Sequence, residues 1–410
     1  MKRFSILCFA AATLLAVLPV LNMDQSRARA QDVTITIKKN DTEPAKPAFT
    51  GKRAAVDVAI LLDTSNSMDG LISQAKSQLW KIVQKFSACE KSGQTPSLRV
   101  AVFEYGNTNL PASEGYVRQV VQLTDDLDRV SEALFSLKTN GGDEYCGTVI
   151  NEALKRLDWT KESSAYKAIF IAGNEPFTQG SVDYQDTCKK AIESGVVVNT
   201  IHCGNYQAGV KGKWQHGAAL AEGEFLNINQ DKAVVHIPAP QDKIIIELNN
   251  DLNKTYLWFG KDTLRKSYQR NQYDQDRNAL QQSGGSGFGG GRGAIKASKA
   301  YGNRGRDLVD TLESDEGILS KLESSLLPDE MQKMSVKERT AHVKSMASKR
   351  AEIQKKIQAA VKEREAYVAK VRAQNATDGE EGKADTFGTA ISEAIDKQLK
   401  KSGFKSTKNK

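Results

Sequence analysis

The chain lacks the features that mark several protein classes. Proline is scarce, with 9 among 410 residues, and the 31 glycines follow no regular period, which excludes a collagen-like fibre. Only one long apolar run occurs, at the N-terminus, which excludes a polytopic membrane protein. The phosphate-loop, nucleophile-elbow and HExxH motifs are absent, and no CxxC pair is present. The 39% of hydrophobic residues is nevertheless enough to build a core, which excludes disorder of the whole chain.

The N-terminus has the layout of an export signal. Lys2 and Arg3 precede an apolar run over residues 4–21, and an A-x-A cleavage site follows at residues 28–30. We therefore predict a signal peptide over residues 1–30 and a mature protein in the periplasm, outside the cell or at its surface. A retained N-terminal anchor is the alternative, because the polar stretch before the cleavage site is long.

Positive charge is concentrated in the second part of the chain. The formal net charge is +8, yet residues 261–410 alone hold 30 Lys and Arg against 21 Asp and Glu. A basic extension suggests nucleic acid, but an exported protein rarely meets it, so we predict no nucleic-acid partner. Contact with an anionic envelope surface fits better.

Five cysteines are present, and one of them, Cys8, falls in the export signal. Four cysteines in an oxidising compartment suggest two disulfides, with the pairing open. Free buried thiols are the alternative, and the absence of a CxxC pair makes structural zinc improbable. The four residues concerned are Cys89, Cys146, Cys188 and Cys203.

Apolar runs alternate with amphipathic stretches over residues 53–260, after a polar tether at residues 31–52. Strands are expected at 55–62, 98–105, 116–123, 168–172, 196–202 and 225–228, and helices at 71–86, 126–137, 149–157, 182–194, 214–222 and 242–253. Most of the strands are continuous apolar runs, which is typical of parallel sheets covered on both faces. The pattern predicts a doubly wound, mainly parallel α/β domain, closed by the helix at 242–253.

A Gly-rich linker is predicted at residues 261–293, followed by a basic helical region at 294–410. A long helix at 335–374 has apolar residues at coiled-coil-like spacing, interrupted by Arg350 and Arg364. The pattern favours a helical hairpin or self-association through the C-terminal helices. A solvated single helix is the alternative.

Oxygen-bearing side chains follow the first strand of the α/β region. Asp63, Ser65 and Ser67 form an Asp-x-Ser-x-Ser motif between that strand and a helix. A loop at the carboxyl end of a central parallel strand lies where open α/β sheets bind ligands. Carboxylate and hydroxyl oxygens suit Mg²⁺, Mn²⁺ or Ca²⁺. The motif therefore predicts a divalent metal site, although the same residues could simply cap the helix.

At this motif the chain resembles the von Willebrand factor A (VWA) domain family over about residues 54–235, with the motif as the first loop of its metal-ion-dependent adhesion site (MIDAS). The resemblance implies that the second loop adds Asp143, with Thr139 and Thr148 as alternatives. It also implies a third-loop ligand, where Asn174 stands in place of the usual Asp. The stretches GGDEYCG, FIAGNEPF and NTIHCGN look similar to an exported bacterial branch of the family.

What the resemblance implies is binding rather than catalysis. The ion would take an acidic side chain of a protein partner as its missing ligand, and Mg²⁺ is the expected ion, with Mn²⁺ or Ca²⁺ as alternatives. A second hypothesis is a metal-free structural envelope protein that assembles or anchors through its basic helical arm. A third, an enzyme that uses the neighbouring His202 and Cys203, is disfavoured because adjacent strand residues point to opposite faces.

Overall fold

The computed structural model describes residues 53–87, 89–229, 231, 236–282, 288, 291–377 and 387–406, all of which fall in the compact unit Pro47–Lys410. The predicted export signal at 1–30 and the tether at 31–52 lie outside the described residues.

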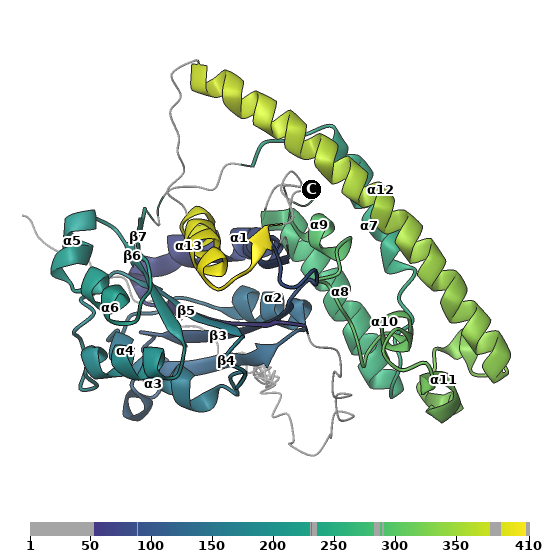
Figure 1. The fold of residues 1–410 in the computed structure, drawn as a ribbon, viewed down its shortest axis with the longest axis horizontal. Helices are drawn as coiled ribbons and strands as arrows, with labels where there is room; N and C mark the ends of the chain where they lie inside the picture. The colour runs from purple at the N-terminus through teal and green to yellow at the C-terminus, as the bar shows by residue number, and fades with distance from the viewer. Residues whose placement is uncertain are drawn as a thin grey trace, which may run out of the picture. The chain divides into compact units, whose positions relative to one another are not determined.

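A six-stranded sheet forms the centre of the α/β part (Figure 1). Its strands, in the spatial order β4-β3-β1-β5-β6-β7, are β4 (Val117–Thr124), β3 (Ser97–Tyr105), β1 (Ala55–Asp63), β5 (Tyr166–Gly173), β6 (Val197–Cys203) and β7 (Phe225–Ile228). Only the β3–β4 pairing is antiparallel. The order runs outward in both directions from β1, which confirms the predicted doubly wound, mainly parallel fold.

Helices cover both faces of this sheet. They are α1 (Asp69–Ser87), α2 (Leu127–Ser136), α3 (Cys146–Arg156), α4 (Tyr184–Glu193), α5 (Tyr206–Lys211) and α6 (Trp214–Leu220). Alternate residues of β1 enter two separate cores: Val58 and Ile60 join the cluster that contains α1, whereas Ala59 and Leu61 join the one that contains α3. Burial on both faces explains why β1 reads as one continuous apolar run.

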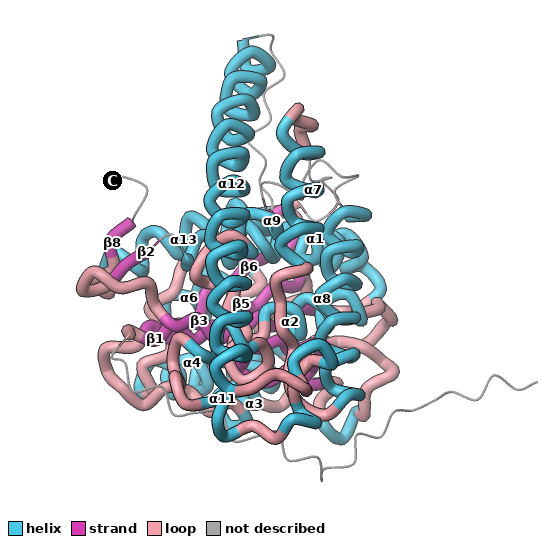
Figure 2. Tube along the Cα trace, turned by 90° about the vertical axis from the view of Figure 1, so that its right-hand side faces the viewer, coloured by secondary structure: helices cyan, strands magenta, loops and turns pink. Residues whose placement is uncertain are grey.

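A helical region follows the sheet (Figures 1 and 2). It contains α7 (Gln241–Asn253), α8 (Asp262–Gln282), α9 (Arg292–Lys296), α10 (Leu308–Leu312), α11 (Ile318–Lys321), α12 (Val336–Thr377) and α13 (Phe387–Lys401), and the short strands β2 (Cys89–Glu90) and β8 (Lys405–Ser406) pair with each other. No helix within the described ranges is long and apolar enough to cross a membrane.

The helix that closes the α/β core is α13, not the predicted helix at 242–253. That predicted helix, α7, packs mainly along α12, as Figure 1 shows. The place against α1 is taken by α13, which buries Ile391, Ile395 and Leu399 in the core. In the sequence, α13 follows the helical region, yet it packs in the core of the α/β domain. The residues between β7 and α13 are therefore inserted within this domain and are not appended to it.

A buried hydrogen-bond network fixes α13 to the sheet. The Gln398 amide nitrogen donates to Asn199, at 2.5 Å, and its oxygen accepts from the Tyr166 hydroxyl, also at 2.5 Å. Gln398 and Asn199 are buried, so losing either partner would leave an unsatisfied polar group. The network thereby selects one register of α13 on β5 and β6.

The long helix α12 uses its arginines as internal anchors. Arg339, Arg350 and Arg364 are all buried on the side that packs within the chain. Arg350 contacts Asp307 at 2.7 Å, and Arg364 contacts Asp242 at 2.6 Å. The two arginines that interrupt the predicted coiled-coil pattern, Arg350 and Arg364, therefore form buried ion pairs. The apolar face of α12 is used inside the chain, and its packing does not support a coiled coil.

Of the predicted Gly-rich linker at 261–293, residues 283–287, 289 and 290 lie outside the described residues, and the others are built into the fold. Residues 262–282 form α8, and Phe288 and Arg292 are buried in the core. The Arg292 guanidinium lies 2.6 Å from Asp128 on α2, and it also contacts Asp276 on α8 and the face of the Trp80 ring on α1. The linker prediction was based on glycine content alone and gave no weight to Arg292. The ion pairs of Arg292 join the helical region to the α/β core.

The four cysteines in the described part of the chain are free and buried, so the two predicted disulfides find no support. Burial raises the pKa of the Cys188 thiol to about 12 and that of the Cys146 and Cys203 thiols well above the usual value. Thiols held in the neutral form are poor nucleophiles.

Truncation of α13 in the core should destabilise the whole α/β part. Ile395 is fully buried against α1, and we expect Ile395→Ala to lower the free energy of unfolding by about 2–5 kcal/mol because it leaves a cavity. The exposed Lys400 of the same helix is the control, and Lys400→Ala should cost less than about 0.5 kcal/mol. Urea unfolding measures both. Equal stability of the two variants would show that α13 is not part of the core.

Candidate metal centre

The Asp-x-Ser-x-Ser motif forms a tight loop at the carboxyl end of β1. Asp63 is the last residue of the strand and is fully buried, and its Oδ1 accepts the backbone N–H of Ser65 at 2.7 Å. The hydroxyls of Ser65 and Ser67 lie 3.3 Å apart. A short 3₁₀ turn at Asn66–Met68 then leads into α1. The three predicted first-loop side chains are thus brought together.

The second loop places Glu144, not the predicted Asp143, beside Asp63. Glu144 is only 5% exposed, and a Cβ added at Gly106 would lie 2.7 Å from Glu144 Cγ and 3.0 Å from Asp63 Oδ1. Asp143 is exposed, and its carboxylate accepts the Tyr145 hydroxyl at 3.2 Å. The hydroxyl of Thr139, a fallback choice, is bonded to Asp69 instead. Glu144 is the acid that faces Asp63 because it lies against Gly106, where the absence of a side chain leaves room for it.

The third loop supplies Asn174, as predicted. Its Nδ2 donates to the Ser67 hydroxyl at 3.3 Å, and its Oδ1 is buried. Gln179 ties this loop to the second one, because it donates to Glu175 at 3.3 Å and accepts from the backbone N–H of Glu144 at 3.2 Å. Gln179 therefore links the position of Glu144 in the second loop to the position of the third loop, which holds Asn174.

Three oxygens that face this point have no hydrogen-bond donor among the described residues. They are Asp63 Oδ2, Glu144 Oε2 and Asn174 Oδ1. Burial raises the pKa of the Asp63 carboxyl, and burial together with the charge of Asp63 raises the pKa of Glu144 to about 9. Buried polar groups are normally satisfied, so these three acceptors make this place the candidate cation site of the described residues.

Comparison with other buried acids strengthens this point. Eight acidic residues are buried in the described part of the chain, and six of them form an ion pair with Arg or Lys. The six are Asp57, Glu104, Asp128, Asp242, Asp276 and Asp307. The two without such a pair are Asp63 and Glu144, which are neighbours.

The donor set fits a hard divalent cation. Two carboxylates, the hydroxyls of Ser65 and Ser67 and the amide oxygen of Asn174 are oxygen ligands of the kind that Mg²⁺, Mn²⁺ or Ca²⁺ prefers. Within the described ranges, no three His, Cys, Asp or Glu side chains are grouped as a metal site. The remaining coordination would therefore come from hydroxyl and amide oxygens and from water, as is usual for Mg²⁺.

His202 and Cys203 do not form a catalytic pair. The His202 ring hydrogen-bonds Asn227 at 3.0 Å and packs edge-on against Trp214, in the core on the α3 side. Cys203 is buried in the core on the opposite side of the sheet. The alternation of β6 separates the two side chains, as their adjacency in the sequence predicts.

Comparisons with known proteins agree with this fold. Residues 57–211 match the family model of the von Willebrand factor type A domain. That range contains the whole of the site described above. No curated protein matches the chain.

Solved structures similar to the chain include several VWA proteins. Proximal thread matrix protein 1 from the mussel byssus, solved with a zinc-occupied MIDAS motif, is 17% identical over 44% of this chain, with a TM-score of 0.35. The match spans only 43% of the mussel protein. BatB from Bacteroides thetaiotaomicron is 17% identical over 43% of this chain and 91% of its own, with a TM-score of 0.33.

The Asp63–Glu144 pair predicts a distinctive pH dependence. The folded-state pKa of Glu144 is raised above its ordinary value of 4.5 to about 9, so ionisation of Glu144 destabilises the metal-free fold. Stability should fall as pH rises between these two values, by up to about 1.4 kcal/mol per pH unit. Glu144→Gln should remove this slope, and urea unfolding in EDTA measures it. Parallel profiles for the two proteins would contradict the assignment.

Proposed function

We propose that the chain is a metal-ion-dependent binding module that captures a protein partner, and not a catalyst. The observation that carries the proposal is the set of three buried oxygens, on Asp63, Glu144 and Asn174, that have no donor among the described residues. VWA domains commonly mediate protein–protein interaction, and residues 57–211 match that family.

A bound divalent ion would supply positive charge and open coordination positions at this edge of the sheet. Asp63 and Glu144 would contribute the negative charge, and Ser65, Ser67 and Asn174 would contribute neutral oxygens. A partner's acidic side chain is the natural additional ligand, because carboxylate oxygen matches the preference of a hard cation. Mg²⁺ is the ion we favour, with Mn²⁺ and Ca²⁺ as alternatives. We also propose that the protein works after export, outside the cytoplasm.

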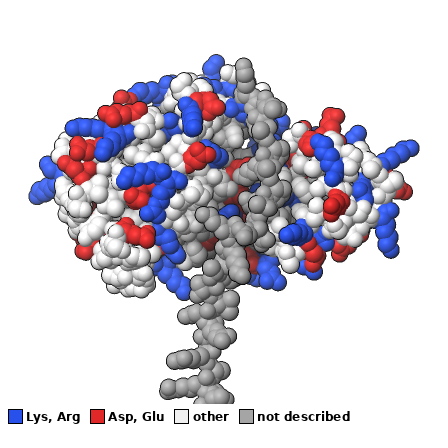
Figure 3. Space-filling model, turned by 90° about the horizontal axis from the view of Figure 1, so that it is seen from below, with Lys and Arg blue, Asp and Glu red and all other residues white. Residues whose placement is uncertain are grey.

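A metal-free role as an anchor on anionic envelope material is the second candidate. The observation in its favour is the excess of basic residues in the helical region. Against it, the face in Figure 3 carries acidic and basic side chains interspersed, and no continuous basic surface is visible there. We therefore favour the metal site.

Substitution of Asp63 should abolish divalent-ion binding. Asp63 is fully buried and lies beside Gly106 and Gly173. Asp63→Ala should therefore eliminate the heat of Mg²⁺ or Mn²⁺ binding in calorimetry. The control is Asp143→Ala, which removes the exposed carboxylate next to Glu144 in the second loop and should change the affinity by less than about twofold. Unchanged affinity in the Asp63 variant would overturn the metal site.

Partner capture should depend on the same ion. A pull-down from envelope extract should recover a protein in Mg²⁺ and lose it in EDTA, and the Asp63→Ala protein should recover none of it in either buffer. Binding that survives EDTA but is lost at high salt would support anchoring through the basic helical region instead.

A further inference from the structure

The loops around the candidate metal centre are acidic, although the chain as a whole is basic. Four loops meet at this edge of the sheet, namely residues 64–68, 106–116, 137–145 and 174–183. Together they hold one basic residue, Lys138, and five acidic residues, which are Glu114, Asp143, Glu144, Glu175 and Asp183. In the whole chain, 58 Lys and Arg outnumber 50 Asp and Glu. Charge therefore distinguishes this edge from the rest of the protein.

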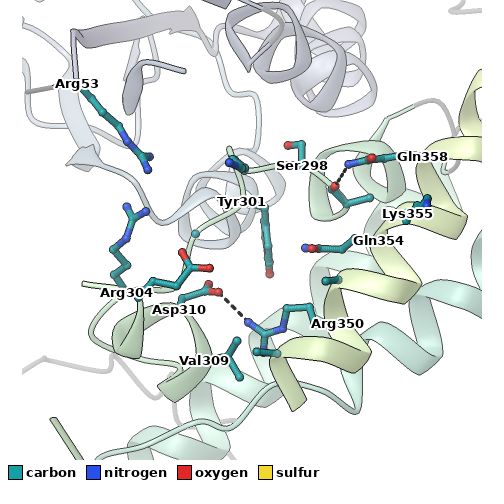
Figure 4. A pocket seen from close by; sticks show the side chains of 16 residues that line it. Arg53, Ser298, Tyr301, Arg304, Val309, Asp310, Arg350, Gln354, Lys355 and Gln358 are labelled. Atoms are coloured by element: carbon teal, nitrogen blue, oxygen red, sulfur yellow. Dashed lines mark hydrogen bonds and ion pairs between the residues drawn. The ribbon is translucent and has the colours of Figure 1, made fainter. Parts of the chain in front are cut away.

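Acidic side chains elsewhere have basic neighbours. In the cavity of about 380 Å³ beside α12, drawn in Figure 4, Arg350 donates to the carboxylate of Asp310 at 2.8 Å. Glu114, in the loop 106–116, likewise lies 3.9 Å from Arg156 on α3. In both places the negative charge is balanced within the chain.

Asp143 and Glu175, in the second and third loops, have neutral partners instead. The Tyr145 hydroxyl donates to Asp143 at 3.2 Å, and the Gln179 amide donates to Glu175 at 3.3 Å. The carboxylate of Asp143 is exposed. Burial raises the pKa of Glu144, and nearby carboxylates, Glu175 among them, raise it further. Negative charge beyond that of the buried acids therefore surrounds the metal centre.

Two tyrosines, Tyr116 and Tyr145, form an aromatic corner beside Asp143. Their ring centroids lie 5.9 Å apart, and both residues are partly exposed. A Cβ added at Gly180 would lie 2.8 Å from Tyr145 Cγ, so only glycine allows the third loop to lie against this ring. Tyr116 has a φ of 54°, a conformation that is unfavourable for residues other than glycine. Strain of this kind is concentrated at binding sites.

The aromatic corner is directly connected to the metal centre. Tyr145 follows Glu144 in the second loop, and the backbone oxygen of Tyr116 accepts the N–H of Gly106 at 3.1 Å. Gly106 is the residue that lies against both Asp63 and Glu144. A peptide segment bound at the metal ion would therefore pass close to the two rings.

A partner's carboxylate on the ion would add negative charge to this edge. The two positive charges of a divalent ion balance Asp63 and Glu144 when both are ionised. The partner's carboxylate would then face Asp143 and Glu175, and like charges in contact weaken binding. A basic group in the same segment removes this repulsion. Arg and Lys bind both to carboxylates and to the faces of tyrosine rings, and the aromatic corner with Asp143 offers both.

We propose that the aromatic corner and Asp143 bind a basic side chain, Arg or Lys, of the protein segment whose acidic side chain ligates the metal ion. The partner is recognised by two opposite charges, the acid at the ion and the base at the aromatic corner. This inference rests on the proposed function, because it concerns the partner that the metal centre captures.

Short synthetic peptides test the proposal on the full chain. Each has a fluorescent label and one Asp in a Gly-Ser background. One set carries an Arg at varied distances on either side of the Asp, and the other set carries Gln at the same positions. In Mg²⁺, fluorescence anisotropy should show that the tightest Arg peptide binds about tenfold more tightly than its Gln counterpart.

The outcomes separate this proposal from the proposed function. Equal affinity of Arg and Gln peptides would overturn the basic-side-chain site, whereas loss of their binding in EDTA would still support the metal-dependent function. An Arg preference that persists in EDTA would support the basic-side-chain site and contradict the metal-dependent function. If neither set binds, this proposal is overturned, and calorimetry with Mg²⁺ alone shows whether the metal centre fails as well.

Variants locate the site. Tyr145→Leu removes the ring and should reduce the Arg preference to less than about threefold, and Tyr145→Phe should lie between this variant and the native chain because it keeps the ring. Asp143→Asn should also reduce the preference, and it remains the test if Tyr145→Leu fails to fold. The control is Glu193→Gln, which removes an exposed carboxylate at the far end of α4 and should change the preference by less than about twofold. Equal losses in the Asp143 and Glu193 variants would indicate general attraction to acidic residues and refute a built site.

Discussion

The fold depends on basic partners for most of the acidic side chains that it buries. Six of the eight buried acidic residues in the described ranges have an arginine or lysine partner. Several of these ion pairs, such as Asp128–Arg292 and Asp242–Arg364, join elements that are far apart in the sequence. An unpaired buried charge is expensive, because desolvation is not offset. Asp63 and Glu144 break this rule at the same place, the carboxyl end of β1. These two adjacent acids without a basic partner are the feature on which the proposed cation site depends.

The same rule explains how the helical region belongs to the α/β domain. Arg292 joins Asp128 of α2 to Asp276 of α8, and Arg350 holds α12 to Asp307. Removing one partner of such a pair leaves a buried charge, so each contact also specifies one arrangement of the helices. With α13 packed against α1, the helices between β7 and α13 are enclosed on both sides by parts of one core. The region is therefore an integral part of the domain rather than a separate arm.

Local patterns predicted much of this structure. The continuous apolar runs gave the strands of the parallel sheet, and the Asp-x-Ser-x-Ser spacing located the first loop of the site. What could not be predicted depends on long-range contacts. The choice between Asp143 and Glu144 is made by the approach of Gly106, which comes from another strand end. The choice of α13 over α7 as the closing helix is made by packing between α1 and α13, which lie about 300 residues apart in the sequence. Arg350 and Arg364 look like interruptions of the coiled-coil pattern in the sequence, because their acidic partners, Asp307 and Asp242, are known only from the structure.

The second buried carboxylate of the candidate site belongs to Glu144 in the second loop, and the third loop holds the neutral Asn174. The pattern of the resembling family expects an Asp in the third loop, where Asn174 stands, whereas Glu144 adds a carboxylate in the second loop. The candidate site therefore holds two buried carboxylates, one in the first loop and one in the second. Glutamate has a longer side chain than aspartate, so its placement needs support, and Gln179 gives it by bonding both the Glu144 backbone and Glu175 of the third loop. A shift of the third loop would then move the second carboxylate as well, so the positions of the two loops depend on each other.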